Sequence, residues 1–416
     1  MVATSPFMSA VRNRPLMVLA GGHFTVDMYS GILPVMYPLL IGRFDLDLKT
    51  VGLVSLAYSG SASVSQPFFG WLADRYGTRL TGIALAWTGV LFACIGFAPS
   101  FPILLIVAAF AGLGSGAFHP MGAVTANRVI PEGRKNTAMS IYGTGGTFGV
   151  ATGPLVGALL FNLLGVRATG LLLLPGISIA IWVLWSMRSV GYQDRTPLAS
   201  RAPAGAVPVG LLAIIVAVMM LRSFPVFGLQ NFVPIWYQEL GYGAGFYGPL
   251  ATVIVLGSAF GAVIAGNLAD AYGRRAVILW TQVLTIPAIW AFAEFPGRWG
   301  FVTGALVGLL AASTAPLLLV MAQQLMRGRA GVASGLILGL GFVAGAIGTP
   351  VFGALADAFG MQNAVRSQLV VVTGTIFIAW LLPSEARIRH QTHLSERAEP
   401  AAPRSGTIAA APERVN

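Results

Sequence analysis

The sequence has few of the charged residues that soluble proteins place on their surfaces. Only 9% of its 416 residues are charged, against roughly 25% in an average soluble domain, and 56% are apolar. We therefore expect the chain to lie in a lipid bilayer. Its one cysteine, Cys94, excludes a disulfide framework within the chain and falls in an apolar run, where a buried packing role is expected.

The motifs of ATP-driven and metal-dependent proteins are also missing. The sequence contains no G-x-x-x-x-G-K-[ST] phosphate-binding loop, so ATP hydrolysis is not expected. The four histidines, His23, His119, His390 and His393, form no H-E-x-x-H pattern and have no cysteine partners, so we predict no metal site and no cofactor. No basic stripe with interleaved aromatic residues occurs, so nucleic acid is not an expected partner. An ion gradient remains as the energy source, and the chain is not expected to be an enzyme.

Long apolar runs fill the sequence instead. A membrane-spanning helix needs about 20 mostly apolar residues. Twelve runs satisfy this requirement, near 15–41, 50–73, 80–98, 101–127, 136–163, 167–187, 209–238, 246–269, 276–294, 299–325, 331–356 and 364–383. The first run is too long for the apolar core of a signal peptide, so we expect it to remain as the first helix.

One segment occurs twice, 196 positions apart, each time at the end of an apolar run. Residues 70–79, GWLADRYGTR, return as residues 266–275, GNLADAYGRR. At the same offset Pro38 falls on Pro234 and Pro120 on Pro316. The sequence therefore predicts an all-α membrane protein of twelve transmembrane helices in two pseudo-symmetric halves of six. This is the plan of transporters in which one half moves against the other around a site at their interface.

The distribution of positive charge predicts the orientation. If the N-terminus is cytoplasmic, 19 of the 25 Lys and Arg residues fall on the cytoplasmic side and five on the other, while one lies within a helix. Both termini are therefore predicted in the cytoplasm, with the chain in the inner membrane. We divide the chain into an N-terminal half (1–187), a cytoplasmic linker (188–208), a C-terminal half (209–384) and a disordered cytoplasmic tail (385–416).

The repeated segment carries a known signature. Its pattern of Gly70, Asp74, Arg75, Gly77 and Arg79 resembles the loop after the second helix of the major facilitator superfamily, and the repeat extends the resemblance over nearly the whole chain. Glycine at position 70 would let two helices approach closely, and Asp74 can face the positive N-terminal end of a helix. The resemblance implies a conformational latch that stabilises the outward-open state, with Asp74 near the start of the run 331–356. In the second copy Asp270 and Arg275 take the matching places.

A second motif lies in the run 136–163. Its G-x-x-x-G-P-x-x-G core contains Gly149, Gly153, Pro154 and Gly157 and resembles a motif associated in this superfamily with drug:proton antiporters. Small residues four apart form a groove for a partner helix, and the proline bends the helix axis. Tight packing alone would also explain the spacing.

A further combination resembles the fosmidomycin resistance protein branch of the superfamily, whose members export an antibiotic phosphonate or related compounds. It consists of GLGSGAFHP at 112–120, the pairs Gly133-Arg134 and Gly145-Gly146, and His23 with Asp27. That branch often has a glutamate after the His-Pro pair, where this chain has Met121.

Asp27 is the one acidic residue predicted at mid-membrane depth. An ionisable group there costs about 2.5–3.5 kcal/mol on insertion scales unless it is paired or hydrated. His23 lies one helical turn earlier on the same face, so the two can share a proton. We predict that they form the proton-coupling site, because mid-membrane carboxylates usually mark ion pathways. A neutral buried pair that only fixes packing is the alternative.

Arg222 lies in the middle of the run 209–238, and the 196-residue offset places Asp27 on Ser223, its neighbour. Arg222 is predicted either to bind an anionic substrate or to form a structural salt bridge with Asp27. Further substrate contacts are expected from His119, Gln66, Tyr29, Tyr142, Gln230 and Asn231. For His119, a packing role and a role as proton carrier are open alternatives.

The sequence thus predicts a monomeric secondary transporter that moves a small organic compound by alternating access. We expect proton-coupled efflux, in which protonation of Asp27, modulated by His23, changes the preference between inward-open and outward-open states. A proton-coupled uptake symporter of an organic anion or sugar is the first alternative, because the fold does not fix the direction. A non-transporting membrane sensor is the second. The expected partners are the small-molecule substrate, protons and the lipid bilayer.

Overall fold

The computed structural model describes residues 12–76, 80–129, 135–190, 207–326 and 330–388. Within these ranges every regular element is a helix. The first group of elements comprises α2 (Arg14–Phe44), α3 (Leu48–Ser55), η1 (Leu56–Gly60), α4 (Ser61–Tyr76), α5 (Thr81–Ile95), α6 (Phe101–Arg128), α7 (Lys135–Leu164), η3 (Val166–Leu172) and α8 (Leu173–Val190). The second comprises α9 (Val209–Glu239), α10 (Ala244–Tyr272), α11 (Arg274–Glu294), η4 (Gly297–Trp299), α12 (Gly300–Ala311), α13 (Ala315–Leu325), α14 (Ala330–Phe359) and α15 (Met361–Ala379).

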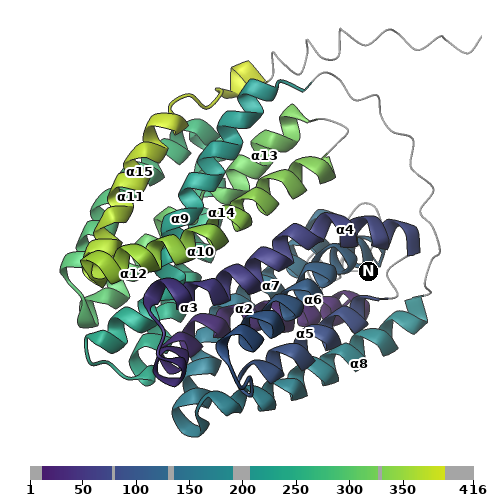
Figure 1. Cartoon of the computed structure of the whole chain (residues 1–416). Coiled ribbons are helices and arrows are strands. Elements are labelled where there is room, and N and C mark those ends of the chain that lie inside the picture. The colour runs from purple at the N-terminus through teal and green to yellow at the C-terminus, as the bar shows by residue number, and fades with distance from the viewer. Residues whose placement is uncertain (1–11, 77–79, 130–134, 191–206, 327–329, 389–416) are drawn as a thin grey trace, which may run out of the picture.

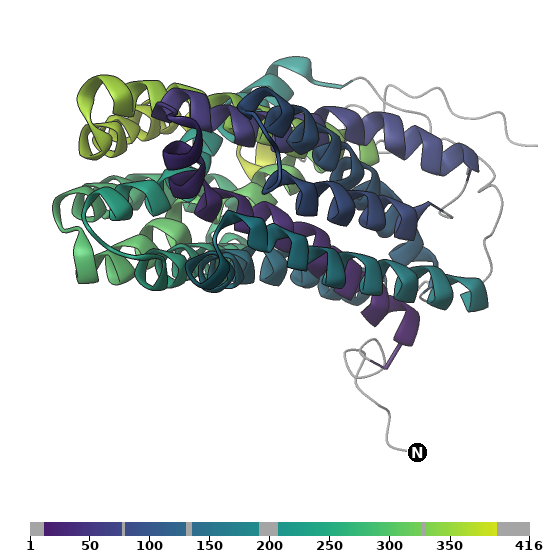
Figure 2. The same cartoon turned by 60° about the horizontal axis from the view of Figure 1, so that its bottom comes forward.

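The helices have the length and composition of membrane spans. In the described residues, nine are long and apolar enough to cross a bilayer. The three other predicted spans fall on the passage α3–η1–α4, on the 15-residue apolar helix α5 and on α15. The prediction of an all-helical fold that crosses the membrane many times is confirmed. Turned by 60°, the helices are seen to run roughly along one common direction (Figure 2).

Two predicted spans are less regular than expected. The run 50–73 contains a π-helical turn, η1, between α3 and α4. The run 299–325 is divided into α12 and α13, because Pro316 in the first turn of α13 has no N–H to donate to the preceding turn. This break leaves carbonyl groups at the end of α12 without helical partners.

The two groups of helices meet at one end of the molecule. They contact each other through the pairs α2 with α9, α3 with α14 and α7 with α10. Figure 1 shows them meeting near α3 and lying farther apart toward α4 and α13. The buried apolar residues follow the same division. One core cluster contains residues of both groups, such as Tyr37 and Phe232, whereas at the other end each group has a core of its own.

The outer surface of the described helices is strongly apolar. Large side chains such as Phe260, Trp280 and Val370 are mostly exposed. Such a surface is suited to lipid and not to water. Cys94 also lies exposed, on α5, so the predicted buried packing role for this residue is wrong.

The predicted boundaries between segments shift slightly. Helix α8 extends to Val190, into the predicted linker, and residues 191–206 lie outside the described part. Residues 385–388 form a helical turn in which Glu385 pairs with Arg274 at 3.1 Å. The prediction of disorder from residue 385 is therefore wrong for these four residues, and the remainder of the tail lies outside the described residues.

Candidate functional site

Helix α2 places Asp27 near its middle. The helix spans 31 residues and is capped by Asn13, whose side-chain Oδ1 accepts from the Leu16 N–H at 3.1 Å and whose Nδ2 donates to the Val129 carbonyl at 2.9 Å. Pro15 follows in the first helical turn, where a missing N–H costs nothing. This anchored start fixes how far Asp27 lies from the end of the bundle.

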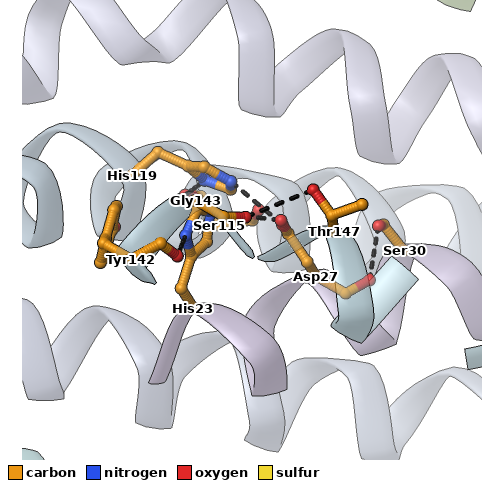
Figure 3. A network of polar contacts seen from close by, with 8 residues as sticks. All are labelled: His23, Asp27, Ser30, Ser115, His119, Tyr142, Gly143 and Thr147. Carbon is orange, nitrogen blue, oxygen red and sulfur yellow. Dashed lines mark hydrogen bonds and ion pairs between the residues drawn. The ribbon is translucent and has the colours of Figure 1, made fainter. Parts of the chain in front are cut away.

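The carboxylate of Asp27 contacts two histidines (Figure 3). Its Oδ2 lies 3.2 Å from His23 Nε2, one turn earlier on α2, and its Oδ1 lies 3.0 Å from His119 Nε2 on α6. The side chains are 17%, 12% and 29% exposed for Asp27, His23 and His119, so the cluster is shielded but can be reached by water. The contact between His23 and Asp27 follows from their spacing, whereas His119 was expected to contact substrate.

The other nitrogen of each ring is held by a backbone carbonyl. His23 Nδ1 donates to the Tyr142 carbonyl on α7 at 2.8 Å, and His119 Nδ1 donates to the Ser115 carbonyl at 2.7 Å. A carbonyl only accepts, so both Nδ1 atoms carry a hydrogen. In a neutral imidazole the Nε2 atom then holds a lone pair. A hydrogen bond at each contact with the Asp27 carboxylate therefore needs one further proton, carried on Nε2 or on the carboxyl group.

The same three side chains match the ligand types of a divalent metal site. Their candidate ligand atoms all lie within 4.8 Å of one another. The nitrogen–oxygen pairs lie at hydrogen-bond distance, so bridging protons account for the geometry as it stands.

A row of glycines on α7 lets α2 approach closely. A β-carbon at Gly146 would lie 2.6 Å from His23 Nε2 and would also collide with the Asp27 carboxylate. A β-carbon at Gly149 would strike the Phe24 carbonyl, and one at Gly153 would lie 2.6 Å from the Met28 carbonyl. Glycine at these positions thus brings the backbones of the two helices into contact and leaves room for the cluster.

The rest of the predicted helix-packing motif is less crowded. A β-carbon at Gly157 would lie 3.2 Å from the Ile32 side chain, a tight contact that a small shift of this side chain would relieve. Pro154 lies where α7 meets the second group of helices, because a β-carbon at Gly248 on α10 would lie 3.0 Å from its carbonyl oxygen.

Tyr142 orients His23 from the opposite side. The two rings stack with centroids 4.2 Å apart and planes 23° apart, and the Tyr142 carbonyl accepts from His23 Nδ1. The Tyr142 hydroxyl is buried and has no hydrogen-bond partner in the described part of the chain. Tyr142, predicted as a substrate contact, therefore holds the histidine in place in this structure.

Arg222 lies in the second group of helices and is buried, with 5% of its surface exposed. Its Nη2 donates to the Ala311 and Ala312 carbonyls at 3.4 and 3.3 Å, and its Nη1 lies 3.2 Å from the Met219 sulfur. These carbonyls end α12, at the break before α13, where the helix dipole is negative. Among the described residues Arg222 has no acidic partner. The alternative of a salt bridge with Asp27 is therefore not realised in this structure.

The remaining predicted substrate residues do not join the cluster. Tyr29 is fully buried, and its hydroxyl donates to the Leu172 carbonyl at 2.8 Å, so in this structure it packs between helices. Asn231 accepts from the Tyr37 hydroxyl at 3.0 Å and thereby joins the two groups of helices. Gln66 on α4 and Gln230 on α9 are half-buried.

The predicted latch is only partly described. Asp74 and Arg75 belong to the last turn of α4, but their side chains, together with Gly77 and Arg79, lie outside the described residues. A β-carbon at Gly70 would lie 3.8 Å from the Pro120 side chain, an ordinary contact. The expected close approach of helices at Gly70 is thus absent from this structure.

The second copy of the segment is described. Asp270 is exposed at the end of α10, and Arg275 Nη2 donates to the Trp380 carbonyl at 2.6 Å. Arg274 adds its contacts with Glu385 and with Gln324, at 2.8 Å. This copy therefore ties the start of α11 to the end of α15 and to α13.

The sequence matches the family model of the Major Facilitator Superfamily over residues 19–254 and 215–412. The chain belongs to this superfamily. It is 31% identical over 396 residues to the uncharacterized MFS-type transporter YfnC of Bacillus subtilis (strain 168), covering 90% of this chain and 94% of that protein. It is 28% identical over 348 residues to the fosmidomycin resistance protein of Escherichia coli (strain K12), covering 80% and 84%.

The fold is also found among solved structures. A bacterial homologue of the human lysosomal transporter Spinster superposes with a TM-score of 0.69 at 18% identity, over 95% of this chain and 98% of that one. The chain is therefore a multi-pass membrane protein and a secondary transporter of a small molecule, and, as predicted, not an enzyme.

Proposed function

We propose that the chain exports a small organic compound in exchange for protons, and that His23, Asp27 and His119 form its proton site. The observation that supports this most directly is the pair of contacts between Asp27 and the two Nε2 atoms, because a hydrogen bond at either contact requires a bridging proton. Similarity to a protein named for fosmidomycin resistance supports export of such a compound.

The number of bridging protons determines the charge of the cluster. With both protons present it carries one net positive charge, with one proton it is neutral, and with none it carries one negative charge. When the proton between Asp27 and His119 is lost, the Nε2 lone pair of His119 faces a carboxylate oxygen of Asp27, and the two repel each other. Because Asp27 belongs to α2 and His119 to α6, deprotonation pushes these two helices apart. This gives proton release a direct mechanical effect on helix packing.

Arg222 supplies the positive charge of the second half. Its contacts with the end of α12 are long, 3.3–3.4 Å, and an anionic group would be a stronger acceptor than these carbonyls. We therefore propose a small organic anion as substrate, bound through Arg222. In the same proposal the transporter acts as a monomer in the inner membrane, with both termini in the cytoplasm.

The charge of the protonated cluster favours a second candidate function. One net positive charge at the cluster, together with Arg222, would bind an anion more tightly when both protons are present. Binding of substrate and protons together is the behaviour of a symporter, which would take up the anion instead of exporting it.

The sign of the proton flux separates the two functions. Small organic anions, beginning with fosmidomycin, are first screened for binding by thermal shift of the purified protein. A binding compound is then added outside proteoliposomes that contain a pH-sensitive dye, with EDTA present so that no metal ion is the coupled cation. Exchange for protons raises the internal pH and supports the proposal. A fall in internal pH identifies a symporter, and bound substrate without any proton flux contradicts proton coupling.

A further inference from the structure

Asp357, in the last turns of α14, bonds to the other half of the molecule. Its Oδ1 accepts from the Leu48 N–H at 2.9 Å and its Oδ2 accepts from the Lys49 N–H at 2.8 Å. Leu48 and Lys49 are the first two residues of α3, whose N–H groups have no partners within the helix. The carboxylate thus satisfies two backbone donors across the boundary between the halves and meets the positive end of the α3 dipole.

The N-terminus of α3 already has a cap from its own half. Asp47 accepts from the Thr50 N–H at 2.7 Å, and hydrogen bonding from the side chain and then the backbone of Thr50 lowers the pKa of the Asp47 carboxyl below its ordinary value. Two carboxylates therefore accept from the first three N–H groups of one helix. Asp47 belongs to the helix it caps, whereas Asp357 comes from the other half, so only the Asp357 bonds depend on how the halves are placed.

The backbones of α3 and α14 touch beside these bonds. A β-carbon at Gly52 would lie 2.9 Å from Pro350 Cα, and a β-carbon at Gly353 would collide with the Leu48 carbonyl. The core cluster that contains residues of both halves surrounds the same end. This end of the transporter is closed, and Asp357 lies at its rim, exposed to solvent.

Asp357 also belongs to a third copy of the repeated segment. Residues 353–360 read GALADAFG, beside GWLADRYG at 70–77 and GNLADAYG at 266–273. All three follow the pattern G-x-L-A-D-x-aromatic-G. The first two copies lie at the end predicted to be cytoplasmic, whereas the third ends α14 at the closed end, where α2 passes into α3.

We propose that Asp357 is the latch of the conformation seen here. It holds α3 and α14 together at the closed end, and both bonds must break each time the transporter opens there. With cytoplasmic termini the closed end is extracytoplasmic, so the latch stabilises the inward-open state. The proposal goes beyond proton coupling, because it concerns the conformational equilibrium of any substrate cycle through this fold. Asp357 acts as a positioning residue, since it holds the N-terminus of α3.

The test measures the opening of this end by pulsed electron spin resonance. Exposed Cys94 is replaced by serine, and spin labels are attached to Gly42→Cys on α2 and Asn363→Cys on α15, one in each half. A side chain at Gly42 meets nothing within 4 Å, so the label fits. Asp357→Ala removes two bonds to a charged group, and we expect the ratio of open to closed populations at this end to rise about tenfold.

A matched control variant and a second latch variant distinguish loss of the latch from general misfolding. Asp47→Ala removes a cap from the same helix end without changing any contact between the halves, so it should lower thermal stability and leave the label distances unchanged. Leu48→Pro removes one donor and keeps Asp357; proline is tolerated at this first helical position, and the extended backbone of Asp47 suits it. It should shift the distances in the same direction as Asp357→Ala.

Equal distance distributions in the parent protein and in both latch variants would overturn the proposal. An equal shift in Asp47→Ala would do so as well, because it would show general loosening of α3. The measurement needs no proton gradient. A missing shift therefore leaves the proton site untouched, and a failure of proton coupling leaves the latch untouched.

Discussion

Replacing Asp27 by asparagine separates proton binding from the shape of the site. Asparagine has the size of aspartate, but its amide donates as well as accepts. One side of the amide can donate to the lone pair of a neutral histidine Nε2, while its oxygen still accepts from the other ring when that ring is protonated. The variant therefore keeps both contacts and holds one bridging proton fewer than the wild type. It also exchanges two charge-assisted hydrogen bonds for weaker ones, which lowers the free energy of unfolding by about 2 kcal/mol.

We expect Asp27→Asn to lose substrate-driven proton flux and to retain exchange of substrate for substrate. Both are measured in the same proteoliposomes, flux with the internal dye and exchange with labelled substrate on both sides at equal pH. Unchanged expression and a single thermal transition establish that the variant folds. Proton flux at the wild-type rate in this variant would refute the reasoning, because the carboxylate would then not take part in coupling.

Three further predictions concern the surroundings of the cluster and the topology. Gly146→Ala places a β-carbon 2.6 Å from His23 Nε2, so it should impair proton flux and destabilise the protein by about 1–3 kcal/mol. A β-carbon at Gly143 meets nothing within 4 Å, so the control Gly143→Ala should be tolerated. Thermal unfolding and proton flux are measured for both variants. Because Asp27 contacts histidines and Arg222 contacts carbonyls, the stability losses of Asp27→Asn and Arg222→Gln should add, and recovery in the double variant would reveal a salt bridge that forms in another state. Reporter fusions should find both termini in the cytoplasm, and a reporter active outside would contradict the charge count.

The sequence was sufficient to predict the helices and the repeat, because span length and internal similarity are local properties of the chain. The contact of His23 with Asp27 was predictable for the same reason, since residues four apart lie on one helical face. His119 lies 92 residues from Asp27, and no local pattern connects them. Its partnership with Asp27 was therefore missed, although both residues had been singled out.

Other contacts were missed because a membrane helix is apolar on all sides. The direction in which Tyr29 points could not be read from periodicity, so its packing between helices was not predicted. The packing role of Gly146 could have been inferred from the pair Gly145-Gly146, which extends the glycine spacing of the motif toward the cluster. The bonds between Asp357 and α3 depend on the placement of one half against the other, which the sequence of either half does not contain.

The glycine seam between α2 and α7 has a mechanical consequence. Because backbone meets backbone at Gly149 and Gly153, no side chain lies between the two helices at these positions that could change rotamer to absorb a displacement. This close contact favours movement of α2 and α7 as one unit, with His23 held to α7 by its bond to the Tyr142 carbonyl. His119 belongs to a different helix, α6, and precedes Pro120, which removes one backbone hydrogen bond of that helix. In the proposed mechanism, α2 and α7 therefore hold their side of the cluster fixed, and proton release moves α6 relative to them.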